Sequence, residues 1–241
     1  MKKLLLSLFT VALAMNASFG QAEKALLDAQ KKSISDAIKK SDEEVKKSPL
    51  KARSWLNRSQ AYLDLALFPD STLTLTNPEA PFLAYEYANE AIKLDTKEGK
   101  KGAVAKEIDQ LFADKKYSNA FLNLGVIKYQ GKDYRGSLRY MSKASEIAPN
   151  DTTNAMYTGV TAQLCKEDKI ATVAYEKYLA IGGKDLAILY GLSQIYKSNK
   201  EEEKSLAIID KAISIYPTNK DLKGEKFNML IAFNRIDQAM V

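Results

Sequence analysis

Few side chains in this sequence could carry catalytic chemistry. Histidine, the usual general base and the commonest metal ligand, is absent from all 241 residues. Cys165 is the single cysteine, and its apolar neighbours Leu164 and Ile170 favour a small packed residue over a nucleophile. The sequence has no phosphate-binding loop motif and no dinucleotide glycine fingerprint. It therefore predicts no catalytic residue, no metal site and no cofactor.

Two short stretches contain residues that occur in catalytic or phosphate-binding sites. Glu201 to Glu203 form an acidic run between two helical patterns, where a solvated loop is expected rather than a catalytic carboxylate pair. Gly183 lies midway between Pro149 and Pro217, 34 residues from each, so Gly182 and Gly183 indicate a turn between helices. We predict that the protein is not an enzyme. The alternative is an unfamiliar carboxylate site, which would need a deep pocket with converging acidic side chains.

The basic residues are spread along the chain. Lysine and arginine number 36 against 30 acidic residues, and lysine pairs begin at 31, 39, 46, 100 and 115. Nucleic-acid binding would require a concentrated basic stripe combined with aromatic residues or arginine. We therefore expect no nucleic-acid partner.

The first residues have the pattern of a secretory signal peptide. Two lysines precede an apolar run from Leu4 to Met15, and the small, polar stretch "NASFG" follows. A permanent membrane span needs about 20 apolar residues, so this run is too short. We predict a signal peptide over 1–20, cleaved after Gly20 or Ala22, and a mature protein that does not span a membrane. Its location would be periplasmic or else extracellular; the alternative is a buried N-terminal helix.

Small residues recur every 34 positions in the second half of the chain. Two antiparallel helices approach closely only where their side chains are small, so these residues would let paired helices nest. One row is Gly125, Gly159 and Ser193, and a second row, twelve residues further on, is Ser137, Ala171 and Ser205, continuing to Ala239.

The residues around these rows also recur in 34-residue units. The first unit has Phe121, Leu124, Gly125, Ser137, Met141, Ala144 and Pro149, and the third has Leu189, Leu192, Ser193, Tyr196, Ser205, Ile209, Ala212 and Pro217. This pattern resembles the tetratricopeptide repeat family, and in particular an exported bacterial member. The family signature is an aromatic residue, Leu-Gly, Tyr, Ala, an aromatic residue and a closing Pro within 34 residues. The resemblance implies an all-α fold, a right-handed α-solenoid of antiparallel helix pairs that forms a superhelix.

The expected domain organisation follows from these units. We expect a loop insertion at 65–81, which contains three prolines, to be non-helical, as either a surface excursion or a flap over the concave face. The units are an N-terminal helix over 21–48, a first repeat-like unit over 49–97 that carries the insertion, an elongated bridging helix over 98–117, repeats over 118–151, 152–185 and 186–219, and a partial repeat over 220–241.

The partial repeat has an unusual composition. Phe227 replaces the small residue, and no polar capping helix follows, although solenoids need such caps. We therefore hypothesise that the natural chain continues past Val241 or that this end docks on a partner, including another copy of the chain.

The concave face of such a solenoid is lined by the first helix of each unit. Family members that grip a C-terminal carboxylate carry a lysine, asparagine and arginine clamp there, whereas this chain has largely apolar residues. We predict a non-catalytic protein- or peptide-binding scaffold of the bacterial cell envelope that binds an apolar segment or helix. The alternatives are a structural subunit that assembles through its terminal helices, or a face that only packs internally. The predicted binding residues are Leu122, Val126, Tyr129, Met156, Val160, Gln163, Tyr190, Gln194 and Lys197.

Overall fold

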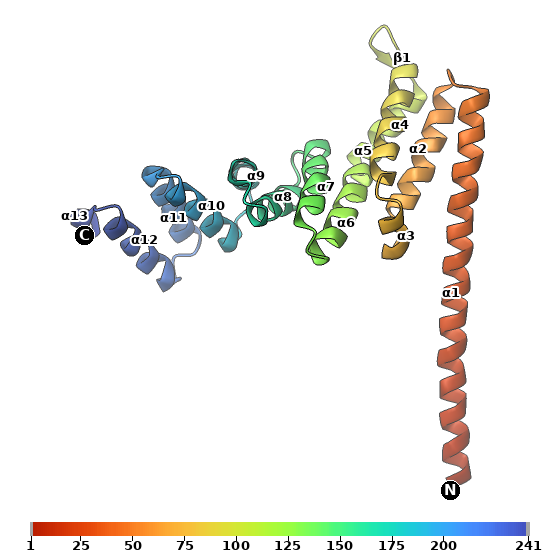
Figure 1. Ribbon diagram of the computed structural model, residues 1–241, viewed down its shortest axis with the longest axis horizontal. Coiled ribbons are helices and arrows are strands. Elements are labelled where there is room, and N and C mark those ends of the chain that lie inside the picture. Colours follow the sequence, from red (N-terminus) through yellow and green to blue (C-terminus); the bar gives the residue numbers. More distant parts are fainter. Residues whose placement is uncertain (1, 240–241) are drawn as a thin grey trace. The chain divides into compact units, whose positions relative to one another are not determined.

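The computed structural model describes the backbone of residues 2–239 and the side chains of residues 24–239. The chain divides into two compact units, Met1–Leu111 and Phe112–Val241. Over the described residues the structure is helical apart from one hairpin of two-residue strands, so the all-α prediction is confirmed (Figure 1). The side chains of the predicted signal peptide, 1–20, lie outside the described part. No helix in that part is both long and apolar enough to cross a membrane.

The second unit is a succession of helix hairpins. Three residues connect the two helices of each hairpin. In the first hairpin the third of them, Asp133, is the N-cap of the second helix. The pairs are α6 (Lys116–Gln130) with α7 (Tyr134–Ile147), α8 (Thr152–Leu164) with α9 (Asp168–Ala180), α10 (Leu186–Ser198) with α11 (Glu202–Ile215), and α12 (Lys220–Ala232) with the short α13 (Ile236–Ala239).

These turns share one backbone conformation. Their central residues have φ between 57° and 62°, in the left-handed region that ends many helices. The residue that follows donates its backbone N–H to a carbonyl five positions earlier, as Glu201 does to Tyr196 at 2.8 Å. This left-handed row also recurs every 34 positions, at Lys132, Lys166, Lys200 and Asn234.

Small residues hold the paired helices together, as predicted. All six residues of the two rows from Gly125 to Ser205, called here the small-residue seam, are buried. The Ser137 hydroxyl donates to the Gly125 carbonyl at 2.7 Å across the first hairpin. In the third hairpin, the Ser193 and Ser205 hydroxyls each donate to the other residue's carbonyl, at 3.1 and 2.9 Å. The seam thus brings the two backbones within reach of a serine side chain.

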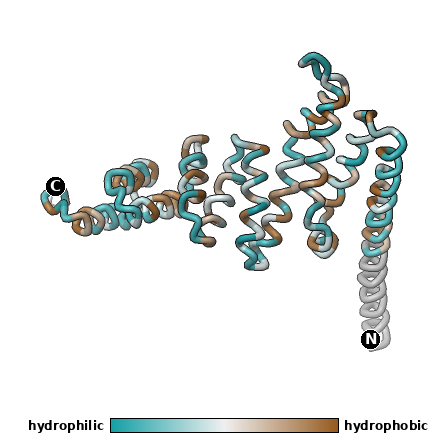
Figure 2. The backbone as a smooth tube through the Cα atoms, turned by 45° about the horizontal axis from the view of Figure 1, so that its top comes forward, coloured by the Kyte–Doolittle hydropathy of each residue, from teal (hydrophilic) through white to brown (hydrophobic). Residues whose placement is uncertain are grey.

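Large residues fill the space beside the seam. Phe121, Met141, Tyr175, Leu189 and Ile209 are at most 1% exposed. One core cluster extends from α8 through α11 to α12, so neighbouring hairpins share their hydrophobic interior. Hydrophobic and hydrophilic residues accordingly alternate along these helices (Figure 2).

The first unit contains a similar pair with a longer connection. Ser59 of α2 donates its hydroxyl to the Ala84 carbonyl of α4 at 2.6 Å, which repeats the seam contact across 25 residues. The elements are α1 (Lys2–Lys47), α2 (Ala52–Ala66), α3 (Ser71–Thr76), α4 (Ala80–Leu94), β1 (Thr96–Lys97), β2 (Lys100–Lys101) and α5 (Ala103–Ala113).

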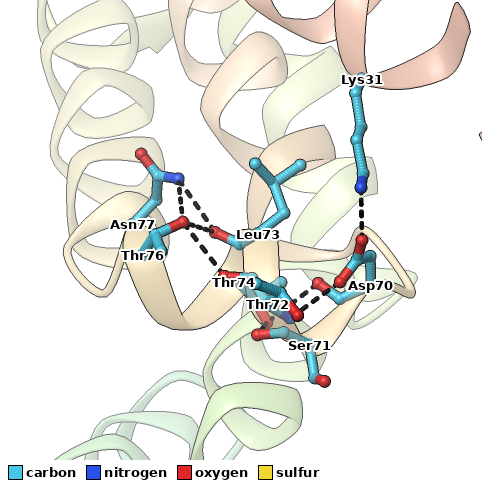
Figure 3. Close-up of polar contacts among 8 residues, drawn as sticks. All are labelled: Lys31, Asp70, Ser71, Thr72, Leu73, Thr74, Thr76 and Asn77. Carbon is cyan, nitrogen blue, oxygen red and sulfur yellow. Dashed lines mark hydrogen bonds and ion pairs between the residues drawn. The ribbon is translucent and has the colours of Figure 1, made fainter. Parts of the chain in front are cut away.

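The prediction of a non-helical loop over 65–81 was wrong. The segment contains the end of α2, the whole of α3 and the first residues of α4. The Asp70 carboxylate caps α3 by accepting from the Thr72 N–H at 2.8 Å, and Lys31 of α1 forms an ion pair with it at 2.5 Å (Figure 3). The Asn77 side chain donates to the Leu73 carbonyl at 2.9 Å near the other end. These side-chain contacts support a short helix between the prolines.

The elongated helix predicted over 98–117 was also wrong. Residues 96–101 form the β1–β2 hairpin, in which Glu98 and Gly99 have positive φ. The Asp95 carboxylate accepts from the Ala105 N–H at 2.9 Å and so stabilises the start of α5. At the other end, Lys115 has a φ of 59°, which interrupts the helical backbone before α6 begins. A helix is therefore present within the predicted range, but it covers only Ala103–Ala113.

Two glycines at equivalent seam positions should respond differently to alanine. A methyl group on Gly159 would overlap the rigid ring of Tyr175, whereas one on Gly125 would meet the flexible end of Met141, with Sδ at 2.9 Å. We expect Gly159→Ala to lower the free energy of unfolding by about 1–3 kcal/mol. Gly125→Ala should be nearly neutral, because a helix-propensity gain of about 1 kcal/mol offsets the shift of Met141. Urea unfolding of both variants checks this, and equal losses would contradict it.

The cap of α3 should have a measurable pH signature. The Lys31 ammonium, with the Thr72 N–H, lowers the pKa of Asp70. A lowered pKa means that this contact stabilises α3 above the ordinary aspartate pKa, and that the stabilisation is lost as the pH falls through the lowered pKa. We expect Lys31→Ala to return the pKa of Asp70 toward its ordinary value, as measured by NMR titration. The pKa of Asp133, lowered by Gly136 and Lys128, is the control and should not move.

Candidate binding site

The nine predicted binding residues lie on one face of three first helices. They occupy positions i, i+4 and i+7 of α6, α8 and α10, which fall on the same side of a helix. The residues of the three helices correspond at intervals of 34 positions, as in the series Leu122, Met156 and Tyr190. We call these nine residues the first-helix face. Eight of them are half-buried and Gln194 is exposed, so the face is a shallow surface of partly accessible side chains.

The apolar part of this face rests on the hydrophobic core. Met156, Val160 and Tyr190 are partly buried against the core cluster of α8 to α12. Burial also raises the pKa of the Tyr190 hydroxyl, with help from the nearby carboxylates of Glu225 and Asp221. Each of these side chains therefore packs against the core on one side, as the internal-packing alternative expects. Their other side remains accessible to a partner.

Gln163 is positioned by a residue of the second helix. The Tyr175 hydroxyl of α9 donates to Gln163 Oε1 at 2.7 Å. Burial, with a smaller effect from Tyr129, raises the pKa of Tyr175 to about 12, so its hydroxyl stays protonated as a donor. Tyr175 can reach this position because glycines flank its ring: Gly159 in its own repeat and Gly191 in the next. The sequence marked Gly159 as a small packing residue but did not reveal this polar contact.

Aromatic and polar residues form the edges of the face. The Tyr129 ring packs edge-on against Tyr157 of α8, with centroids 6.4 Å apart, and also meets Tyr134. At the other end, Gln194 Nε2 donates to Glu225 Oε1 at 3.2 Å. The face therefore carries apolar and aromatic side chains on α6, and an amide and a lysine beside Tyr190 on α10.

The acidic run and the cysteine show no arrangement suited to catalysis. Glu201 pairs with Lys204 at 2.5 Å and Glu203 with Arg235 at 2.6 Å, so the run's ends bind different cations. Burial raises the pKa of the half-buried Cys165 thiol, which disfavours a reactive thiolate. Among the side chains of residues 24–239, no group of three or more His, Cys, Asp or Glu is placed to hold a metal ion.

The glycine pair forms the predicted turn. Gly182 has a φ of 95°, and the Gly183 N–H donates to the Tyr178 carbonyl at 2.8 Å. A side chain at Gly183 would overlap the Tyr178 ring, so this position needs glycine for close packing. The turn between α9 and α10 explains both glycines.

One groove in the second unit was not anticipated from the sequence. It lies between the second helices α7 and α9, shares no lining residue with the first-helix face, and has a volume of about 430 Å³. Its exposed apolar residues are Ile170 and Val173. They break the repeat pattern, because the residues 34 positions earlier are Gly136 and Arg139. A comparison of the outward positions of the repeats could have found them.

Hairpins with a 34-residue period and a buried small-residue seam define an all-α fold of the tetratricopeptide type. Residues 186–219, which contain α10 and α11, match the family model described as tetratricopeptide repeat. This match confirms the repeat predicted over 186–219 and the resemblance seen in the sequence. No curated protein matches the chain.

Several solved structures are similar to the chain at low identity. MamA 41-end from Desulfovibrio magneticus RS-1 is 16% identical with a TM-score of 0.45, over 76% of this chain and 89% of that one. The P58(IPK) TPR domain is 15% identical with a TM-score of 0.44, over 88% of this chain and 69% of that one. YrrB, described as a TPR protein with an unusual peptide-binding site, is 16% identical with a TM-score of 0.41, over 82% of this chain and 86% of that one.

Proposed function

We propose that this protein is a non-catalytic scaffold that binds an apolar segment or helix of a partner protein through the first-helix face. The observation that carries the proposal is the arrangement of nine partly accessible side chains at i, i+4 and i+7 on α6, α8 and α10. Helices that pack side by side at a constant repeat present such side chains as a continuous surface. A partner helix or extended segment could therefore contact several repeats at once.

The chemistry of the face favours an apolar partner. Leu122, Val126, Met156 and Val160 occupy its positions i and i+4 on α6 and α8, where a carboxylate-gripping face would need cationic and amide groups. Removing the accessible part of such side chains from water is favourable by about 25 cal/mol per Å². Binding driven in this way should depend little on salt, because charge screening acts on ionic contacts.

The binding proposal is tested with the pair Val126→Glu plus Val160→Glu. Two carboxylates on the first-helix face should remove most of the partner recovered by the wild-type chain, residues 21–241, from an envelope extract. The matched control is Ala180→Glu plus Ala207→Glu, two exposed alanines on second helices, which should leave recovery unchanged. Equal recovery by both double variants would contradict the proposal. If the glutamates lower the melting temperature, Val126→Thr plus Val160→Thr makes the same comparison with nearly unchanged side-chain volume.

A second function is favoured by the exposed apolar residues of the last helices. Phe227, Ile231 and Ile236 are 48%, 45% and 49% exposed, on α12 and α13. This surface suits a structural subunit that assembles through its terminal helices. Light scattering distinguishes the two functions. A scaffold should keep a constant molar mass in the absence of ligand, whereas an assembly subunit should increase in molar mass with concentration. Phe227→Ser should abolish that increase.

We also propose that the protein is exported to the bacterial cell envelope. The support is the pattern of two lysines, the apolar run from Leu4 to Met15 and the small residues after it. The expected result is a mature N-terminus after Gly20 or Ala22, found by N-terminal sequencing of protein from the periplasmic fraction. Intact Met1 on cytoplasmic protein would contradict export.

A further inference from the structure

The groove between α7 and α9 is built from side chains of three helices. The second helices form its walls, and Thr158 of α8 contributes to its floor. The Thr158 hydroxyl is satisfied internally by the Met141 carbonyl at 3.0 Å and the Asn154 carbonyl at 2.7 Å, so the floor does not require a polar ligand. The lining residues are Ser142, Ser145, Glu146, Thr158, Lys169, Ile170, Val173, Ala174 and Lys177.

The fold does not require apolar side chains at the mouth of this groove. Ile170 and Val173 are 41% and 64% exposed, one turn apart on α9. At the first of these positions, the neighbouring repeats carry Gly136 and Lys204; at the second, they carry Arg139 and Ala207. Only the middle repeat of the three therefore presents two branched apolar residues to solvent here. Exposed apolar groups gathered in a groove are typical of an interaction site.

The corresponding space beside α11 is smaller, with a volume of about 230 Å³, and ion pairs bridge it. Lys226 of α12 pairs with Asp210 at 2.7 Å, and Arg235 pairs with Glu203 at 2.6 Å, among the residues that line that space. Between α7 and α9, by contrast, Lys177 Nζ donates to the neutral carbonyl and hydroxyl of Ser145, at 3.0 and 3.2 Å. A lysine with a neutral partner thus crosses the groove beside Ile170 and Val173, whereas ion pairs cross its counterpart.

The charged residues of the groove give it a positive balance. Lys169 and Lys177 both lie on the α9 wall, and neither forms an ion pair within residues 24–239. Glu146 is the carboxylate of the lining, and it is already paired with Lys143 at 2.7 Å. An apolar surface between lysines that lack a carboxylate partner in this range is complementary to an amphipathic segment whose flanks carry carboxylates.

We infer that the groove between α7 and α9 is a second binding surface, which takes an acidic amphipathic helix of a partner protein. Its apolar side chains, spaced i, i+3 and i+4, contact Ile170, Val173 and Ala174, and carboxylates on its flanks pair with Lys169 and Lys177. The walls set its length: α9 has 13 residues, and at 1.5 Å per residue it offers about 20 Å, or three to four helical turns. The surface is separate from the first-helix face and so adds a binding function to the scaffold.

The test uses two synthetic amphipathic peptides with the same leucine positions, one with glutamate flanks and one with lysine flanks. Fluorescence anisotropy with the wild-type chain should show binding of the acidic peptide about tenfold tighter than that of the basic one. Val173→Glu should weaken acidic-peptide binding by about tenfold. Ala207→Glu, at the same helix position one repeat later and also exposed, should change it less than twofold. Lys169→Glu should reverse the preference between the peptides.

Four results would overturn the inference. Three of them are equal affinities for the two peptides, no acidic-peptide binding up to millimolar concentration, and equal effects of Val173→Glu and Ala207→Glu. The fourth is concentration-dependent dimerisation that Val173→Glu abolishes, because it would assign the groove to a second copy. Val126→Glu plus Val160→Glu should leave peptide binding intact, so failure of the first-helix face and failure of this groove are distinguishable. Circular dichroism verifies that each variant stays folded.

Discussion

The structure depends on the close approach of two helix backbones at each repeat. At the seam, glycine, serine and alanine leave so little space between the helices that the Ser137 hydroxyl reaches the Gly125 carbonyl. Nested helices then leave defined spaces beside them, and Met141 and Tyr175 fill these spaces. The same constraint orients the outer surfaces: once the seam faces inward, the i, i+4 and i+7 residues of each first helix must share one face. Both binding proposals use surfaces whose positions the seam determines.

Much of this could be predicted from the sequence because the constraint leaves a periodic trace. Small residues 34 positions apart indicate closely packed helix pairs, because a larger side chain at these positions would clash with the partner helix. The left-handed row at Lys132, Lys166 and Lys200 has the same period, yet it was missed. Lysine is expected on any solvated helix face, and only glycine or asparagine signals this backbone conformation by its type. The starts of α3 and α5 were missed for a related reason. Each depends on one carboxylate, Asp70 for α3 and Asp95 for α5, and neither contact recurs with the 34-residue period.

The two candidate surfaces differ in how far the sequence could reveal them. The first-helix face follows from helical spacing and the family resemblance, although its degree of burial required the structure. The groove beside Val173 required a comparison of the repeats with each other and knowledge of which charges pair. Beside α11, Glu203 and Asp210 form ion pairs with Arg235 and Lys226, whereas Lys169 has no such partner among residues 24–239. Ion pairing of this kind depends on distances between helices that sequence spacing does not give.

The central claim is that small side chains at the seam hold each hairpin together. Its most direct measurement is the free energy of unfolding, from urea titration, of Ser137→Leu, Ala171→Leu and Ser205→Leu, with the exposed Ala207→Leu as the control. The account predicts that each seam variant loses at least about 1–3 kcal/mol through overpacking. The control should stay within about 0.5 kcal/mol of the wild type. Leucine tolerated at all three seam positions as well as at Ala207 would contradict the account.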